Sequence, residues 1–379
     1  MRLSPVLTGL RTYPFVRLAQ EVARLQAAGV EVIHFGIGEP HEETPAFIRA
    51  ALVDALDPFS TYPSSDGLPQ LRGAIAAWAR RRFGARLDPD RDVIPTLGSK
   101  EAVFLLAQVL DGDIVLVPQP AYPVYERGAV FAGKQVVELP LRAADDFLPD
   151  LDSIPPDMLA RTAILWLNYP NNPTAATAPL ELYERAAALA REHDFVVASD
   201  EAYSELYFGD VPPASALQVA DHTNVAVFNT LSKRSSMPGY RSGFVAGDPD
   251  LIAALKRYRP NVGVAPPEFI QRAATVAWAD EEHVTAVRDG YRAKRDILVP
   301  ALAARGLRHA GGDATFFLWL EGAAPGEHER LLEHGIVLTP GDYFGPAGAG
   351  YLRLALVPTL AECERAAELL AGASVRPAP

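Results

Sequence analysis

Short apolar runs alternate with amphipathic stretches through most of the 379-residue chain. Between about residues 46 and 280, most of these runs are separated by stretches whose apolar residues recur about every 3.6 positions, the period of a helix. This alternation predicts one large α/β layer built on a mainly parallel, seven-stranded sheet. The expected strands are residues 92–96, 113–118, 134–140, 162–168, 194–200, 224–232 and 242–247.

Longer helical patterns lie near each end of the chain. Residues 10–29 have helical apolar spacing that stops at a glycine, and the apolar run 30–36 predicts a strand after them. Residues 281–307 predict a long helix, and we expect Pro300 to interrupt it, because proline lacks the backbone N–H that an inner helical position donates.

Two further strands are expected near the carboxyl end, at residues 315–322 and 350–356, and a terminal helix follows them. Strands and helices that do not alternate regularly are typical of an α+β unit. We therefore expect a large domain over residues 46–280 and a smaller α+β domain formed by residues 1–45 together with 281–379.

Composition and charge narrow the class of protein. The chain is 49% hydrophobic and 22% charged, as in ordinary globular proteins, and its net charge of −12 disfavours general binding to nucleic acid or anionic membranes. The single cysteine, Cys363, rules out an intrachain disulfide and a cysteine metal cluster, and we expect no metal. No run of about 18 apolar residues and no signal-like start occur, so we expect a cytoplasmic protein without a membrane span.

Lys233 is the first candidate for a reacting amine. The chain has five lysines and thirty arginines, and this lysine follows the apolar run VAVFNTLS and precedes the breaker-rich stretch RSSMPGYRSG. Ligands of open α/β sheets bind at the carboxyl ends of the strands, where this position falls. A solvated lysine at the end of a strand is the alternative.

Two more strands end beside polar residues. Asp200 closes an apolar run, and Tyr203 follows three positions later. A buried carboxylate needs a partner, which a protonated ring nitrogen would supply, although an aspartate that caps a helix fits equally well. Asn172 precedes a proline in a rigid loop and could hold a ring hydroxyl; taken alone, a turn without a ligand is the simpler interpretation.

Gly98, Ser99 and Lys100 lie between an expected strand and the first turn of a helix. Unpaired backbone N–H groups there would form an anion site, although an ordinary helix cap or a solvated lysine is equally compatible with these residues. Tyr122 and Tyr125 follow another strand, and either ring could stack on a flat ligand or simply belong to the core.

Arg353 lies among alternating apolar residues of an expected strand, just after the glycine-rich stretch 341–350. An arginine that points inward is costly unless it meets an anion, and a carboxylate is its natural bidentate partner. That carboxylate could belong to a substrate or to an aspartate or glutamate of the protein itself.

Taken together and in this order, these segments resemble the class I and II aminotransferases, which are fold-type I enzymes that use pyridoxal 5′-phosphate. The resemblance extends over nearly the whole chain. Its most specific part is TLSKRSSMPGYRSG, in which Arg241 lies eight residues after Lys233. The supporting segments are SDEAY, NNPT, GSKEA and YLRLAL.

The resemblance implies a role for each candidate near the cofactor ring. Lys233 would form the Schiff base and later carry the proton between the substrate α-carbon and the cofactor. Asp200 would pair with the ring nitrogen, Asn172 and Tyr203 would bind the 3′ oxygen, and Tyr122 would stack on the ring.

The resemblance also implies ligands for the phosphate and for the substrate. The substrate carboxylate would be held by Arg353 with Asn172 and the backbone at Gly38. Tyr62 matches a family tyrosine that reaches the phosphate from the neighbouring subunit, so a homodimer with shared active sites is implied. The remaining phosphate ligands would be Gly98, Ser99, Lys100, Thr230, Ser232 and Arg241.

A finer resemblance concerns the substrate. SKRSSMPGYRSGFVAGD, together with LNYPNNPT, is similar to the N-succinyldiaminopimelate aminotransferases of lysine biosynthesis, which use glutamate as amino donor. Ala175 stands where the family usually has glycine, and we expect a change of loop geometry without loss of a catalytic group. An aspartate-, aromatic- or alanine-type aminotransferase and a β-lyase on the same fold remain the alternatives.

Overall fold

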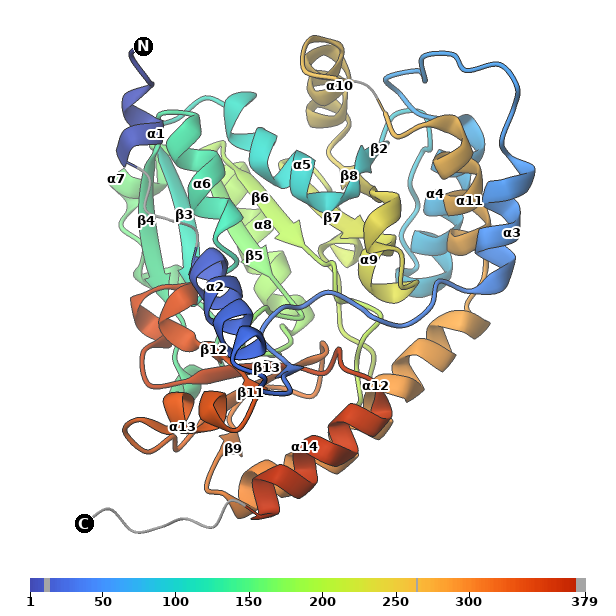
Figure 1. Ribbon diagram of the computed structural model, residues 1–379. Coiled ribbons are helices and arrows are strands. Elements are labelled where there is room, and N and C mark those ends of the chain that lie inside the picture. The colour runs from blue at the N-terminus through green and yellow to red at the C-terminus, as the bar shows by residue number, and fades with distance from the viewer. Residues whose placement is uncertain (10–13, 264, 373–379) are drawn as a thin grey trace.

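The computed structural model describes residues 1–9, 14–263 and 265–372. Its largest unit is a seven-stranded sheet with the strand order β2-β8-β7-β6-β5-β3-β4 (Figure 1). Strand β8 runs antiparallel to both of its neighbours, and the other paired strands are parallel. The strands are β2 (Val93–Leu97), β3 (Ile114–Gln119), β4 (Gln135–Pro140), β5 (Thr162–Asn168), β6 (Val196–Asp200), β7 (Val225–Thr230) and β8 (Ser242–Gly247).

The prediction of a seven-stranded, mostly parallel sheet is confirmed, and one strand overlaps each expected run, with ends that differ by a residue or two. The difference that matters for the site is at the end of the run 224–232. The strand stops at Thr230, whose side chain accepts a hydrogen bond from the Ser232 backbone N–H and so caps the short helix α9 (Leu231–Arg234). Lys233 therefore lies on a helical turn just beyond the strand.

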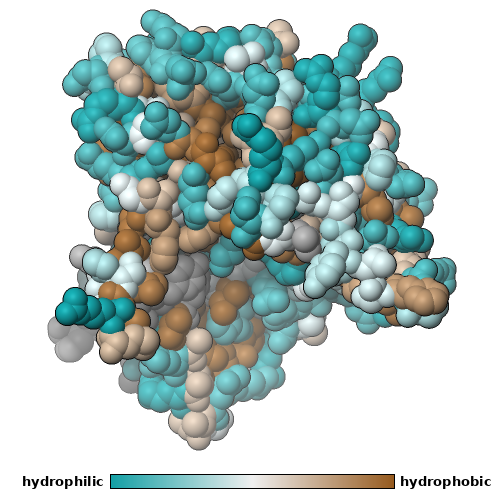
Figure 2. Space-filling view, turned by 90° about the horizontal axis from the view of Figure 1, so that it is seen from above, coloured by the Kyte–Doolittle hydropathy of each residue, from teal (hydrophilic) through white to brown (hydrophobic). Residues whose placement is uncertain are grey.

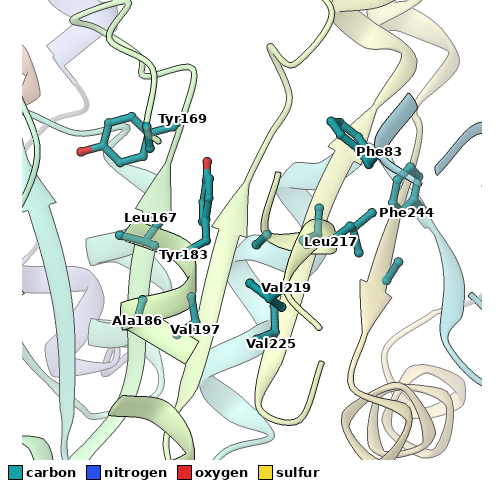
Figure 3. Close-up of a cluster of buried hydrophobic side chains, with 14 of the residues drawn as sticks. Phe83, Leu167, Tyr169, Tyr183, Ala186, Val197, Leu217, Val219, Val225 and Phe244 are labelled. Carbon is teal, nitrogen blue, oxygen red and sulfur yellow. The ribbon is translucent and has the colours of Figure 1, made fainter. Parts of the chain in front are cut away.

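Helices cover both faces of this sheet because successive strand residues point to opposite sides. In β5, Leu165 and Leu167 pack with α4, α8 and α11, whereas Ile164 and Trp166 pack with α5, α6 and α10. Figure 3 shows part of the first of these two cores. The helices are α4 (Pro69–Phe83), α5 (Gly98–Leu105), α6 (Val124–Phe131), α8 (Leu180–His193), α10 (Pro249–Tyr258) and α11 (Glu268–Ala279), and a short α7 (Pro156–Leu159) precedes β5.

The chain also forms a second, antiparallel sheet of order β12-β13-β10-β9 and a parallel pair of strands, β1 and β11. Helices α12 and α14 lie side by side against them (Figure 1). These strands are β1 (Ile33–His34), β9 (Arg308–His309), β10 (Phe317–Glu321), β11 (Ile336–Val337), β12 (Thr339–Pro340) and β13 (Leu352–Ala355). The helices in this part are α2 (Pro14–Ala27), α12 (Glu282–Ala304), α13 (Glu327–Glu333) and α14 (Leu360–Gly372). Helix α3 (Ala46–Asp54) packs on α11 of the larger unit, and the short α1 (Pro5–Gly9) has no buried residue.

The expectation that Pro300 interrupts its helix is wrong, because α12 continues past this residue to Ala304. Leu298 and Leu302, on either side of the proline, are buried in the core that α12 shares with α14, and this packing offsets the lost backbone hydrogen bond. Of the helix expected at 10–29, residues 10–13 lie outside the described part, residues 14–27 form α2, and residues 28–29 form a turn. The division into domains at residues 46–280 remains our proposal.

The surface shows where hydrophilic and hydrophobic side chains gather. On the face seen from above, hydrophilic side chains lie mostly around the outside and hydrophobic ones gather toward the middle (Figure 2). Within residues 1–9, 14–263 and 265–372, no helix has both the length and the apolar character that crossing a membrane requires.

Candidate active site

A cavity of about 330 Å³ opens where three central parallel strands end. Asn168, Asp200 and Thr230 are the last residues of β5, β6 and β7, and all three line it. The structure therefore brings together side chains from distant motifs at one edge of the sheet. The predicted residues that line the cavity are Gly38, Ser99, Lys100, Tyr122, Asn172, Asp200, Tyr203, Thr230, Ser232, Lys233, Arg241 and Arg353.

Lys233 extends from α9 into this cavity. Its Nζ donates a hydrogen bond of 2.6 Å to the backbone oxygen of Gly38, and it lies 5.8 Å from the centre of the Tyr203 ring. Burial lowers the pKa of Lys233 to about 8, and the positive charge of Arg353 acts in the same direction. A much larger share of this amine is therefore neutral near pH 7 than in an ordinary lysine.

Asp200 presents a buried carboxylate to the same cavity. Tyr125 donates its hydroxyl to Oδ2 at 2.8 Å, and the backbone N–H of Ala202 donates to Oδ1 at 3.3 Å. Burial raises the pKa of Asp200 to about 6, although these hydrogen bonds oppose the change. A cationic group bound beside it would favour the ionised form, because an opposite charge repays part of the desolvation cost.

Two residues of this site were not among the predicted ligands. Tyr125 stacks on Trp166 with ring centres 4.6 Å apart and donates its hydroxyl to Asp200. Both Tyr125 and Tyr122 line the cavity. Asn168 donates to the Asp200 backbone oxygen at 2.8 Å and accepts from the Asn172 backbone N–H at 2.9 Å. The sequence feature that could have indicated Asn168 is its position as the last residue of the apolar run 162–168.

Arg353 is brought to the cavity by β13 and is only 2% exposed. Its Nη1 donates to Asn172 Oδ1 at 2.8 Å, and its Nη2 donates to the Gly36 backbone oxygen at 2.8 Å. The ring centres of Phe317 and Phe344 lie 4.2 and 4.5 Å from the guanidinium carbon. The guanidinium is thus held in a fixed, apolar setting in which a carboxylate would be bound strongly.

The start of α5 forms the other end of the cavity. Gly98 has a φ of +70°, and a side chain there would collide with the guanidinium of Arg241, which donates to the Leu97 backbone oxygen at 3.1 Å. The Thr230 and Ser232 hydroxyls lie 2.9 Å apart nearby. Helix N–H groups, hydroxyls and a guanidinium together make an anion site.

Two predicted residues do not line the cavity. Gly98 lies against Arg241 at its edge, as described above. Tyr62 is 94% exposed, in the segment between α3 and α4. Within a single chain the structure therefore leaves Tyr62 apart from the other candidates.

Ala175 adopts a φ of +62°, in the left-handed region that favours glycine. The residue is buried, in the loop that also carries Asn172. Glycine adopts this conformation without strain, whereas alanine carries it at some cost, and the expected change of loop geometry remains a prediction.

Comparison with known proteins identifies the family. The model of the family "Aminotransferase class I and II" matches residues 30–370. An LL-diaminopimelate aminotransferase of Aquifex aeolicus is 44% identical over 92% of this chain and 94% of its own, and one of Dehalococcoides mccartyi is 40% identical over 94% and 95%. A probable N-succinyldiaminopimelate aminotransferase structure from Thermus thermophilus matches with a TM-score of 0.86 and 31% identity, covering 95% of this chain and all of the other.

The chain belongs to the class I and II aminotransferases. Enzymes of this family use pyridoxal 5′-phosphate to move an amino group between an amino acid and a 2-oxo acid. The cavity fits this cofactor: it offers an amine, a carboxylate for a ring nitrogen, and an anion site where Gly98 leaves room for Arg241. The resemblance drawn from the sequence is confirmed at the level of the family.

Gly243 of β8 supports the anion site from below, and we expect its replacement to disturb phosphate binding. A Cβ atom there would lie 2.6 Å from Asn229 O, 2.7 Å from Gly98 C and 2.8 Å from Ser99 N, so Gly243→Ala must push back the start of α5. Such overpacking costs about 1–3 kcal/mol, and a loss of that size in binding predicts an affinity for pyridoxal phosphate about 5- to 150-fold weaker. Titration of the cofactor-free enzyme measures this affinity.

Gly239→Ala is the matched control, because no atom lies within 4 Å of the added Cβ. Pyridoxal without its phosphate should bind the Gly243→Ala variant as it binds the wild type. Unchanged affinity of Gly243→Ala for the phosphorylated cofactor would show that the contact between β8 and α5 does not shape the anion site.

Proposed function

We propose that this aminotransferase acts on LL-diaminopimelate in lysine biosynthesis, with glutamate and 2-oxoglutarate as the second pair. The names of the two relatives at 44% and 40% identity support the free diamino acid. The reaction itself is supported above all by one observation: the amine of Lys233 and the carboxylate of Asp200 enter the same cavity.

The N-succinylated compound remains the second candidate substrate. The segment around Lys233 resembles enzymes that use it, and the similar structure from Thermus thermophilus carries that name as probable. The two compounds differ in charge at the distal end, where one has a free ammonium group and the other an uncharged amide and a further carboxylate. A direct comparison of the two therefore decides between them.

In the proposed mechanism, Lys233 moves the proton. Pyridoxal phosphate supplies an aldehyde carbon that takes up the amino group and a ring that accepts the electrons left when the α-proton departs. Lys233 Nζ would take the proton from the substrate α-carbon and deliver it to the cofactor. Its lowered pKa, near 8, suits it to accept this proton near neutral pH. The hydrogen bond to the Gly38 backbone oxygen would hold the free amine in position between proton transfers.

Asp200 would hold the cofactor's ring nitrogen in its protonated form, and Tyr125 would orient the carboxylate for this contact. Tyr203 and Asn172 would donate to the 3′ oxygen. Because the Asn172 Oδ1 atom already accepts from Arg353, the amide Nδ2 is the group that can donate. Tyr122 would stack on the ring.

The remaining residues bind rather than react. Arg353 would clamp the α-carboxylate of the substrate, with Asn172 and the backbone of Gly38 beside it, and so orient the α-carbon toward Lys233. The phosphate would be held by Gly98, Ser99, Lys100, Thr230, Ser232 and Arg241.

A panel of substrates tests the proposed activity. The purified enzyme with bound cofactor is offered LL-diaminopimelate, its N-succinyl derivative, aspartate, alanine and phenylalanine with 2-oxoglutarate, and glutamate and the 2-oxo acid formed from each donor are both quantified. We expect glutamate from LL-diaminopimelate with a kcat/KM at least tenfold above that for the other donors. A higher value for the succinyl derivative would refute the substrate, and release of ammonia and pyruvate-like products without glutamate would refute transamination.

We also propose that the enzyme is a homodimer whose active sites are completed by Tyr62 of the other subunit. Exposed apolar side chains gather along α3 and the segment after it, including Val53, Leu56 and Phe59, the last of which is 82% exposed. Apolar side chains left uncovered in succession are typical of an interface between subunits. Their segment also carries Tyr62.

Mixing inactive variants tests the shared site. Lys233→Ala protomers and Tyr62→Phe protomers that bind the cofactor poorly should form mixed dimers with one doubly defective site and one intact site. Activity above that of either parent should then appear after subunit exchange. Lys233→Ala mixed with Asp200→Asn is the control without rescue, because both residues belong to one chain's cavity; a fully active monomer would contradict the proposal.

A further inference from the structure

The residue after Lys233 points away from the cavity into the protein interior. Arg234 is 1% exposed, and its guanidinium carbon lies 4.6 Å from the ring centre of Trp278 and 5.7 Å from that of Trp78. Burying a charged group in this way is costly unless its donors are satisfied. Its bonds therefore indicate what it holds together.

The acceptors of Arg234 lie in the last turn of α11 and on the connection that joins it to α12. Nη1 donates to the Ala277 backbone oxygen at 3.1 Å, and Nη2 donates to the Asp280 backbone oxygen at 3.4 Å and to Glu281 Oε2 at 3.0 Å. A planar guanidinium fixes both distance and direction when several of its N–H groups are bound at once. Helix α9 has only four residues, so this anchor restrains the whole turn that carries Lys233.

Ser235 adds a second tie to the same connection. Its hydroxyl lies 2.9 Å from His283 Nε2, and His283 Nδ1 lies 2.6 Å from Asp280 Oδ1. Ser235 is fully buried, so these side chains hold structure and are closed to a substrate. Two successive residues after Lys233 are thus fastened to the start of α12.

Helix α12 also holds the segment that receives the lysine amine. Tyr291 donates its hydroxyl to Glu42 Oε2 at 2.7 Å, and Lys294 is hydrogen-bonded to Glu42 Oε1. Glu42 lies four residues after Gly38, whose backbone oxygen accepts the bond from Lys233 Nζ. Helix α12 and the connection before it therefore hold both the turn that carries Lys233 and the segment whose backbone oxygen accepts from its amine.

We propose that Arg234 is a positioning residue for the transamination step. By tying α9 to the α11–α12 connection, it sets where Lys233 Nζ stands relative to Gly38, and hence relative to the α-carbon of a bound substrate. The inference rests on the proposed function, in which Lys233 is the reacting amine. Arg234 contributes geometry to the proton transfer and takes no part in it.

Three variants of the intact enzyme with bound cofactor test this inference. Arg234→Met fills the space between the two tryptophans without binding the carbonyls, and Arg234→Lys keeps the charge without the fork. Arg272→Met is the matched control, because Arg272 is an exposed arginine of α11 whose ion pair with Glu268 lies away from α9. Stopped-flow absorbance with L-glutamate gives the rate constant of the first half-reaction and the dissociation constant separately.

We expect Arg234→Met to lower the rate constant about 10- to 100-fold, the cost of a small misplacement of a reacting group, with the dissociation constant of glutamate within threefold of the wild type. Arg234→Lys should recover part of the rate, and Arg272→Met should match the wild type. A purely structural role would lower cofactor content or the melting temperature while the rate per bound cofactor stayed normal, and that result would overturn the inference.

Glu281→Ala decides the question if Arg234→Met does not fold, because it removes the side-chain oxygen that accepts from Arg234 Nη2, and the Glu281 side chain is 46% exposed, so its loss leaves no buried cavity. We expect a several-fold slower half-reaction; a rate within twofold of the wild type overturns the inference. Borohydride reduction of the wild type followed by peptide mapping distinguishes a failure of the proposed function from a failure of the positioning role. Cofactor attached to a lysine other than Lys233 refutes the proposed function, whereas cofactor on Lys233 with a normal rate in the variants refutes the positioning role alone.

Discussion

The structure depends on keeping a carboxylate and an amine out of water in one cavity. Burial raises the pKa of Asp200 to about 6 and lowers that of Lys233 to about 8, so each group is pushed toward its neutral form. Such a pair costs free energy that the fold must offset through hydrogen bonds, as Tyr125 does for the carboxylate. A cofactor with a basic ring nitrogen and an aldehyde would use both groups.

The sheet positions one half of this site, and the smaller sheet and the 36–38 segment position the other. Parallel strands β5, β6 and β7 end side by side, so residues far apart in sequence meet at one edge. Arg353 comes from β13 in the smaller sheet, and its bonds to Asn172 and to Gly36 join the three segments. The substrate's carboxylate end would therefore be held where the two sheets meet.

Much of the fold could be predicted from sequence because buried parallel strands are short, apolar and separated by helices. The family could be recognised because its motifs keep their order around Lys233. Contacts between distant side chains could not be predicted: whether Tyr122 or Tyr125 reaches Asp200 depends on how α6 sits on the sheet. Packing also explains why α12 continues through Pro300. A helix whose side chains are packed along its length tolerates a proline that, from the sequence alone, would be expected to end it.

The central claim is that the Asp200 carboxylate, set opposite Lys233, makes removal of the α-proton possible. Its most direct test is the rate constant of the amino-acid half-reaction in Asp200→Asn, measured by stopped-flow absorbance on enzyme whose cofactor content has been verified. Loss of a buried electrostatic group of this kind predicts a fall of about 10²–10³-fold with the fold intact. A rate constant within about threefold of the wild type at full cofactor content would contradict the account.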